Sequence, residues 1–132
     1  MKRILFLSAS LIVLLMQQIS AQGGFTIYDR FNSPLPENQC RFVRIDSQNR
    51  KWFCTEYGLA IFNDTTWSVY LTSNTGIPDN SVKHVAFDNL GNAWISTQNG
   101  GVGVFDGTNW TVYNTSNSGI ASNYIRSITI DS

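Results

Sequence analysis

From residue 25 onward, short runs of apolar residues alternate with clusters of glycine, asparagine and aspartate. In the best-preserved stretch these runs cover residues 82–88, 93–98, 102–105 and 109–113. Runs of this length between turn-forming residues are typical of β-strands. The sequence Asp106-Gly107 between the last two runs is a strong signal for a tight hairpin. No helical periodicity appears in this part of the chain, so the pattern predicts an all-β protein.

The strand pattern repeats about every 42 residues. Residues 67–89 and 110–132 are identical at 10 of 23 aligned positions. Trp52 returns as Trp94. A period near 42 made of four short strands is typical of a β-propeller, with one blade per repeat. The repeats span approximately residues 25–66, 67–109 and 110–132.

The repeats predict two complete four-stranded antiparallel blades. The earlier copy covers residues 40–70 and is one residue shorter between Thr55 and Gly58. Residues 25–28 align with a fourth strand, and residues 124–131 with a first strand. The predicted fold is therefore a β-propeller fragment: two blades, a leading fourth strand and a trailing first strand.

A closed propeller needs roughly four to eight blades. We therefore expect the chain to be the N-terminal part of a longer protein. The alternative is a small protein that closes its ring by association. In either case we expect the open blade edges to favour self-association, because an unpaired strand edge presents free backbone donors and acceptors.

Four tryptophans recur in pairs at fixed repeat positions. Trp52 and Trp94 lie in second strands, and Trp67 and Trp110 lie in fourth strands. Large aromatic rings at repeated positions fit packing between adjacent sheets. We predict a structural role for all four.

The first 21 residues have the features of a secretory signal peptide. Lys2 and Arg3 precede an apolar run over residues 4–16, and the small residues Ser20 and Ala21 close the segment. The apolar run is shorter than the roughly 20 residues that span a bilayer, which disfavours a membrane anchor. We expect cleavage after Ala21, so that residues 22–132 are exported without a stable membrane span.

Charge and cysteine content narrow the function classes. The chain has nine basic and nine acidic residues, and loss of Lys2 and Arg3 leaves a net charge of −2. This balance disfavours nucleic-acid binding, which needs a basic surface. Cys40 and Cys54 could form a disulfide in an exported chain. Their equivalents in other repeats are apolar or small, which favours two buried free thiols instead.

The only histidine, His84, aligns with Phe42 and Ser127. This position favours packing or a local hydrogen bond over catalysis, because no nucleophile or orienting partner stands nearby. The glycine-rich residues 100–103 are not followed by a helix, so they predict a turn and not a phosphate loop. We predict no catalytic residues and no cofactor.

An aspartate recurs at the end of each first strand, as Asp46, Asp88 and Asp131. An aspartate before a Gly/Asn turn most simply accepts hydrogen bonds from the N–H groups of that turn. Calcium binding is the alternative, but oxygen ligands at short spacing are lacking. We predict no metal site.

Three cations share one repeat position near the start of each first strand: Arg41, Lys83 and Arg126. First strands line the central channel of a propeller. A ring of such cations would attract anions such as acidic sugars. The alternative is that they are solvated charges at strand ends that prevent edge-to-edge aggregation.

The repeat resembles the two-component regulator propeller repeat. The likeness rests on Trp110-Thr111-Val112-Tyr113, on the linker over residues 114–120, and on Asn92-Ala93-Trp94-Ile95-Ser96-Thr97. Residues 125–131 and 100–107 also match. The first repeat departs from the pattern, because Phe25 replaces Trp and Arg50-Lys51 replaces the Gly-Asn turn.

This resemblance implies a propeller in a bacterial protein, either periplasmic or secreted. Such propellers often form the periplasmic sensor regions of hybrid histidine kinases in Bacteroidetes-type bacteria, where they sense polysaccharide breakdown products. Related repeats occur in secreted proteins without kinases. The sequence holds no kinase, so signalling is not assigned to it.

The leading hypothesis is an exported, non-enzymatic module that binds a ligand or a protein. If the module binds a ligand, we expect an anionic one, such as an acidic glycan, that contacts Arg41, Lys83 and Arg126. Solvated surface charges are the interpretation that the sequence favours for these three cations, because three copies do not complete a ring and the net charge is not basic. Two alternatives remain: a fragment of a secreted lyase-like propeller enzyme, and a purely structural scaffold.

Overall fold

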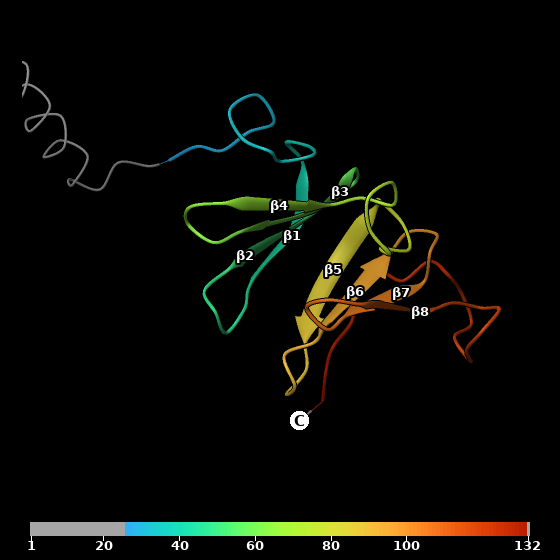
Figure 1. Ribbon diagram of the computed structural model, residues 1–132. Helices are drawn as coiled ribbons and strands as arrows, with labels where there is room; N and C mark the ends of the chain where they lie inside the picture. The colour runs from blue at the N-terminus through green and yellow to red at the C-terminus, as the bar shows by residue number, and fades with distance from the viewer. Residues whose placement is uncertain (1–25, 132) are drawn as a thin grey trace, which may run out of the picture.

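The structure is a computed structural model that describes residues 26–131, and it holds two four-stranded sheets there (Figure 1). The first sheet comprises β1 (Cys40–Ile45), β2 (Lys51–Thr55), β3 (Gly58–Phe62) and β4 (Trp67–Tyr70). The second comprises β5 (Val82–Phe87), β6 (Ala93–Thr97), β7 (Val102–Phe105) and β8 (Trp110–Tyr113). The predicted signal peptide and its cleavage site lie outside the described residues.

Each sheet is an antiparallel meander whose strands follow chain order. This confirms the all-β class and the two four-stranded units expected from the repeat. None of the described residues belongs to a helix with the length and apolarity needed to cross a membrane. The residue missing from the earlier copy falls in the turn between β2 and β3, just before Gly58, the first residue of β3, which adopts a φ of 148°. A turn tolerates such a deletion because it lies outside the strand ladders.

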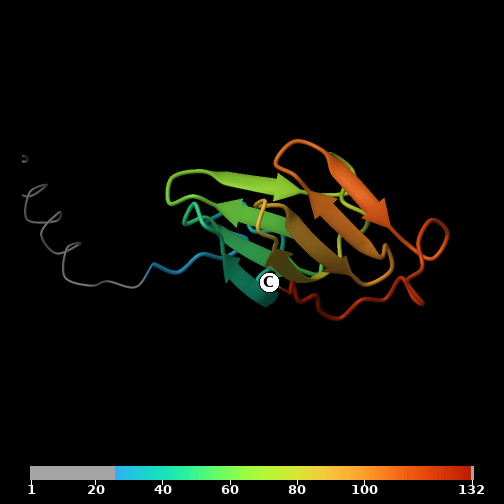
Figure 2. The same ribbon diagram turned by 90° about the horizontal axis from the view of Figure 1, so that it is seen from below.

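The two sheets pack side by side, with β5 against β1 and β2 (Figures 1 and 2). One face of the first sheet contributes Trp52, Cys54, Leu59 and Ile61 to a continuous core. The second sheet contributes Val85, Ala93, Ile95 and Phe105, and the connection between the sheets contributes Ile77. Burying each large apolar side chain is worth about 1.5–3 kcal/mol, so this core is the main force that joins the sheets.

Three loops share one pattern of hydrogen bonds from backbone N–H groups to asparagine side chains. After residue 28, after β4 and after β8, an asparagine side chain accepts from the backbone N–H three residues earlier, at 2.8 Å. A second asparagine accepts from a backbone N–H eight residues earlier, also at 2.8 Å. The pairs are Asn32 and Asn38, Asn74 and Asn80, and Asn117 and Asn123. The loop preceding the first sheet is therefore built like the loop that leads into the second.

A tyrosine docks on each sheet in the same way. Tyr70, at the end of β4, contacts Phe105 and Trp110 with ring centroids 5.4 and 6.1 Å apart. Tyr28 makes the corresponding contacts on the first sheet, to Phe62 at 5.1 Å and to Trp67 at 5.5 Å. Residues 26–28 thus contact the first sheet as the end of β4 contacts the second.

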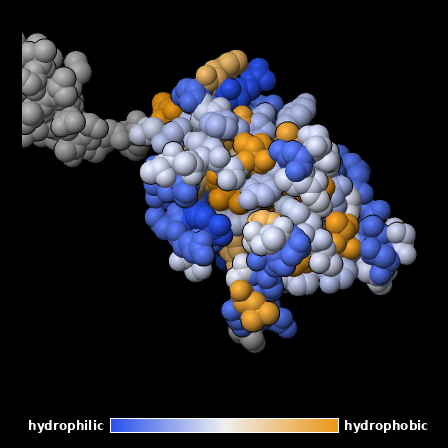
Figure 3. Space-filling model, viewed as in Figure 1, coloured by the Kyte–Doolittle hydropathy of each residue, from blue (hydrophilic) through white to orange (hydrophobic). Residues whose placement is uncertain are grey.

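The outer face of the second sheet is less covered. A hollow of about 380 Å³ lies there, lined mainly by apolar side chains that include Trp94, Val102, Tyr113 and Ile120. Residues 128–130 form part of its wall. On the face of the molecule seen in Figure 3, hydrophobic residues appear in several separate patches among polar ones.

The two terminal strands predicted from the sequence do not form in the described residues. Residues 26–28 and 124–131 have no strand assignment, and Phe25 lies outside the described part. The trailing segment makes single contacts instead, such as Ile125 N–H to Thr97 O at 3.0 Å. A strand needs a ladder of backbone hydrogen bonds, and no described strand forms such a ladder with either segment.

Candidate functional site

Two of the recurring aspartates, Asp46 and Asp88, accept hydrogen bonds from the N–H groups of the following turn and from a tryptophan indole. Asp46 Oδ1 accepts from the N–H groups of Gln48 and Arg50, and Asp88 Oδ1 accepts from those of Leu90 and Asn92. The second oxygen of each accepts from the indole N–H six residues later, in Trp52 or Trp94, at 2.9 Å. The prediction that these aspartates accept turn hydrogen bonds is confirmed, and the indole bond is an addition to it.

These bonds favour the ionised carboxylates. The indole of Trp94 is the main cause that lowers the pKa of Asp88 to about 2, with help from Asn92. Burial raises the pKa of Asp46, but hydrogen bonds from Trp52 and Arg50 outweigh it and the pKa is lowered. Among the residues described, no group of three or more His, Cys, Asp or Glu side chains is arranged to hold a metal ion.

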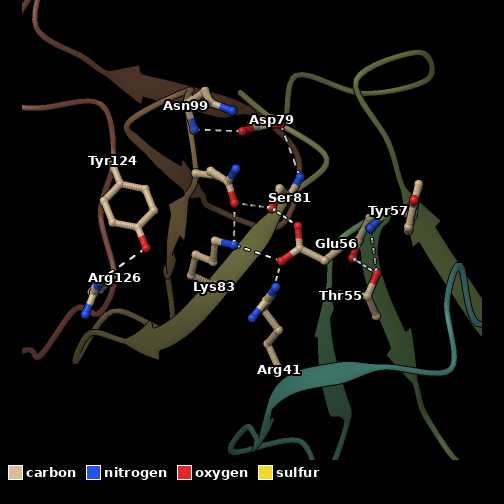
Figure 4. Close-up of polar contacts among 12 residues, drawn as sticks. Arg41, Thr55, Glu56, Tyr57, Asp79, Ser81, Lys83, Asn99, Tyr124 and Arg126 are labelled. Carbon is tan, nitrogen blue, oxygen red and sulfur yellow. Dashed lines mark hydrogen bonds and ion pairs between the residues drawn. The ribbon is translucent and has the colours of Figure 1, made fainter.

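Two of the three predicted cations meet at one carboxylate, that of Glu56 in the turn after β2 (Figure 4). Lys83 Nζ lies 2.8 Å from Glu56 Oε1, and Arg41 Nε pairs with the same oxygen. Ser81 donates its hydroxyl to Glu56 Oε2 at 2.6 Å. Lys83 also donates to Gln98 Oε1 at 2.6 Å. We call Arg41, Glu56, Ser81, Lys83 and Gln98 the inter-sheet cluster, because its members come from both sheets.

The inter-sheet cluster carries one net positive charge. Hydrogen bonds from Lys83 and Ser81 lower the pKa of Glu56 to about 2, so its carboxylate is ionised at neutral pH. It offsets one of the two cations. The side chain of Lys83 is 11% exposed and that of Arg41 is 41% exposed, so Arg41 is the cation that solvent reaches.

Arg126 stands apart from this cluster (Figure 4). Its guanidinium lies over the ring of Tyr124, at 5.6 Å from the centroid, and its Nε is 3.3 Å from the Tyr124 hydroxyl. It forms no salt bridge in the described part of the chain. The structure therefore brings Arg41 and Lys83 together and leaves Arg126 on the trailing segment.

Sequence reasoning missed Glu56. It is the repeat equivalent of Gln98, and it sits in the one turn that differs in length between the copies. The change from glutamine to glutamate opposite two recurring cations was a signal that could have revealed the pair.

The predicted role of His84 in packing and local hydrogen bonding is confirmed. Its ring lies 3.9 Å from that of Phe42, its repeat equivalent in the first sheet. Its Nδ1 accepts a long hydrogen bond, 3.5 Å, from the backbone N–H of Ile128. Burial, and then the charge of Arg44, lower the pKa of His84.

The cysteines are free thiols, as expected, but only one is buried. Cys54 is fully buried, and this burial raises its pKa to about 12. Cys40 is exposed, so the expectation of two buried thiols was wrong. The register explains the absence of a bridge, since Cys40 pairs with Thr55 and Cys54 with Phe42 across a bulge. Cys40 is the first residue of β1, which is an edge strand of its sheet.

The four tryptophans lie between aromatic neighbours. Trp52 is 1% exposed and contacts Phe87 of the second sheet at 5.2 Å. Trp94 is partly exposed and stacks on Tyr113 at 6.1 Å. Trp67 and Trp110 stack on a phenylalanine of their own sheet, at 4.5 and 4.9 Å. Two of the four contact the other sheet: Trp52 through Phe87, and Trp110 through Tyr70 of β4.

Comparison with known proteins adds no relative. No model of a protein family matches the chain, and no curated protein matches it.

Proposed function

We propose that the chain is part of an exported, non-enzymatic β-propeller that binds a ligand or a protein. In this proposal the two sheets are adjacent blades of the two-component regulator propeller type. Residues 26–28 and 124–131 then belong to the blades on either side. The module presents its inner strands, β1 and β5, to the ligand.

The main support for the proposal is that the contacts of one tyrosine with a phenylalanine and a tryptophan recur on both sheets. Tyr70 joins the first sheet to the second, and Tyr28 makes the same contacts one unit earlier. The asparagine bonds of the connecting loops repeat in all three copies. Units that dock on one another in one fixed way form an array, and a propeller is the array in which four-stranded sheets surround an axis.

The ligand proposed is an anionic glycan that contacts Arg41, Lys83 and Arg126. Support comes from the convergence of Arg41 and Lys83 at the junction of the sheets, where one positive charge remains unmatched. The exposed guanidinium of Arg41 can form paired hydrogen bonds with a carboxylate or sulfate. Arg126 adds a second exposed cation on the neighbouring segment.

A structural role for the same cations is the second candidate. One observation favours it: Lys83 is mostly buried and already bonded to Glu56 and Gln98. In that case the cluster joins the sheets and binds nothing else. Self-association through open blade edges remains a prediction under either candidate.

A glycan array probed with the exported chain tests the proposal. We expect binding to acidic glycans that weakens with added salt, because exposed charges are screened over about 8–10 Å at ordinary ionic strength. The variant Arg41→Gln/Lys83→Gln/Arg126→Gln should lose this binding. Lys51→Gln is the matched control, since Lys51 pairs with Asp64 on the first sheet and is not part of the cluster.

Thermal melting of each variant separates the two candidates. If the triple variant binds as well as the parent and only its melting temperature falls, the cations have the structural role. If the chain binds neutral and acidic glycans equally, an anionic ligand is excluded.

A further inference from the structure

A second cavity lies where three segments from different repeats meet. It has a volume of about 250 Å³ and opens between β1, β5 and residues 128–130. Arg44 lines it from β1, and His84, Ala86 and Phe87 line it from β5. It does not include any residue of the inter-sheet cluster.

Arg44 is the cation of this cavity. It is exposed, and it forms no salt bridge among residues 26–131, whereas Arg41, Arg50 and Lys51 each have a carboxylate partner. Its repeat equivalents are Ala86 and Thr129. The packing shared by the repeats therefore does not need a cation here, and the charge of Arg44 is available to a ligand.

His84 supplies a second polar group to the same cavity. Its ring is held against Phe42, and its Nδ1 already accepts from the Ile128 N–H. In the neutral imidazole the other nitrogen then carries the proton, so Nε2–H is the donor left for a ligand. The hydroxyl of Thr129, which also lines the cavity, can donate or accept.

The cavity is small, and most of its surface is polar. Phe87, Ile128 and Ile130 complete its lining. Drug-sized ligands occupy about 300–1,000 Å³, so this cavity suits a smaller molecule. A guanidinium with two further hydrogen-bonding groups favours a carboxylate, which accepts paired bonds from arginine.

We propose that this cavity is a binding site for a small carboxylate, for which D-glucuronate serves as the probe. Arg44 pairs with the carboxylate, and His84 Nε2–H and Thr129 bond to its other polar atoms. The site is independent of the proposed glycan-binding cations, because it uses none of Arg41, Lys83 or Arg126.

Titration of the exported chain with D-glucuronate, followed by NMR of the His84 imidazole and by calorimetry, tests this site. We expect saturable shifts of the His84 signals and a measurable binding heat. D-Glucose, which lacks the carboxylate, should give neither. Arg44→Gln should weaken glucuronate binding at least tenfold, and Arg44→Lys should restore part of it.

Two variants provide the controls. Lys51→Gln alters a cation of the same sheet outside the cavity and should bind as the parent does. The triple variant at Arg41, Lys83 and Arg126 should also keep glucuronate binding. The experiment therefore tests the cavity independently of the glycan-binding role proposed for those three cations. Unsaturable shifts, equal binding of glucose, or full binding by a folded Arg44→Gln variant would each overturn the assignment.

Discussion

The two sheets are built from one repeat, yet equivalent residues differ in burial. In the first sheet and the loop after it, Trp52 is 1% exposed and Ile77 is 3% exposed. Their equivalents, Trp94 and Ile120, are partly exposed and line the hollow on the outer face of the second sheet. The difference follows from cover. Strand β5 packs on the first sheet. No described strand packs on the corresponding face of the second sheet, where residues 128–130 form part of the wall of the hollow. The repeat thus places the same kind of side chain at equivalent positions, and the element packed against each sheet determines whether that side chain is buried.

The largest effect expected is the difference between the two equivalent tryptophans. Trp52→Ala should lower the free energy of unfolding by about 3–5 kcal/mol, as truncation of a buried aromatic does. Trp94→Ala should cost clearly less, because its ring is partly exposed already. Urea denaturation of both variants measures this. Equal losses would mean that the outer face of the second sheet is covered in solution.

Cys54 and Ser96 occupy the same repeat position, and we expect substitutions at the two residues to change the free energy of unfolding in opposite directions, by less than the tryptophan variants do. Both are fully buried, and Ser96 Oγ has no hydrogen-bond partner among the described residues. Cys54→Ser should therefore destabilise by about 1–3 kcal/mol, since it buries another unpaired hydroxyl. Ser96→Ala should be neutral or stabilise by up to about 1 kcal/mol. Denaturation midpoints decide, and a large loss in Ser96→Ala would reveal a partner for that hydroxyl.

The smallest effect that we expect concerns the hydrogen bonds from Trp94 to Asp88 and from Trp52 to Asp46, and the pKa of these carboxyl groups. The pKa of Asp88 is lowered from its ordinary value of 3.8 to about 2. The hydrogen bonds to its carboxylate therefore stabilise the fold fully above about pH 4. This contribution is lost as the pH falls from about 4 to about 2. Trp94→Phe removes the indole N–H and should raise the pKa of Asp88, as followed by carboxyl NMR.

The first sheet provides the comparison for this experiment. Asp46 has an additional bond from the guanidinium of Arg50, at 2.6 Å. Trp52→Phe should therefore shift the pKa of Asp46 less than Trp94→Phe shifts that of Asp88. An unchanged pKa of Asp88 in Trp94→Phe would show that the turn amides alone hold the carboxylate.

The sequence by itself determined the local structure. Apolar runs between turn residues predicted the four strands of the second sheet to within about one residue, and the repeat placed four more in residues 40–70. The position of Asp88 before a turn predicted its acceptor role. These features depend on neighbours within a few positions, so the order of residues contains them. The recurrence of Trp52 as Trp94 extended the same reasoning to a second sheet.

Only the tertiary structure decided what lies between the units. Glu56 reaches Lys83 across the junction, and Arg44 meets His84 and residues 128–130 in one cavity, although no local pattern links them. Segments 26–28 and 124–131 match strands in sequence but lack the ladder partner that makes one. Strand and turn preferences act along the chain, whereas burial, ion pairing and strand pairing require a second surface, and packing supplies that surface.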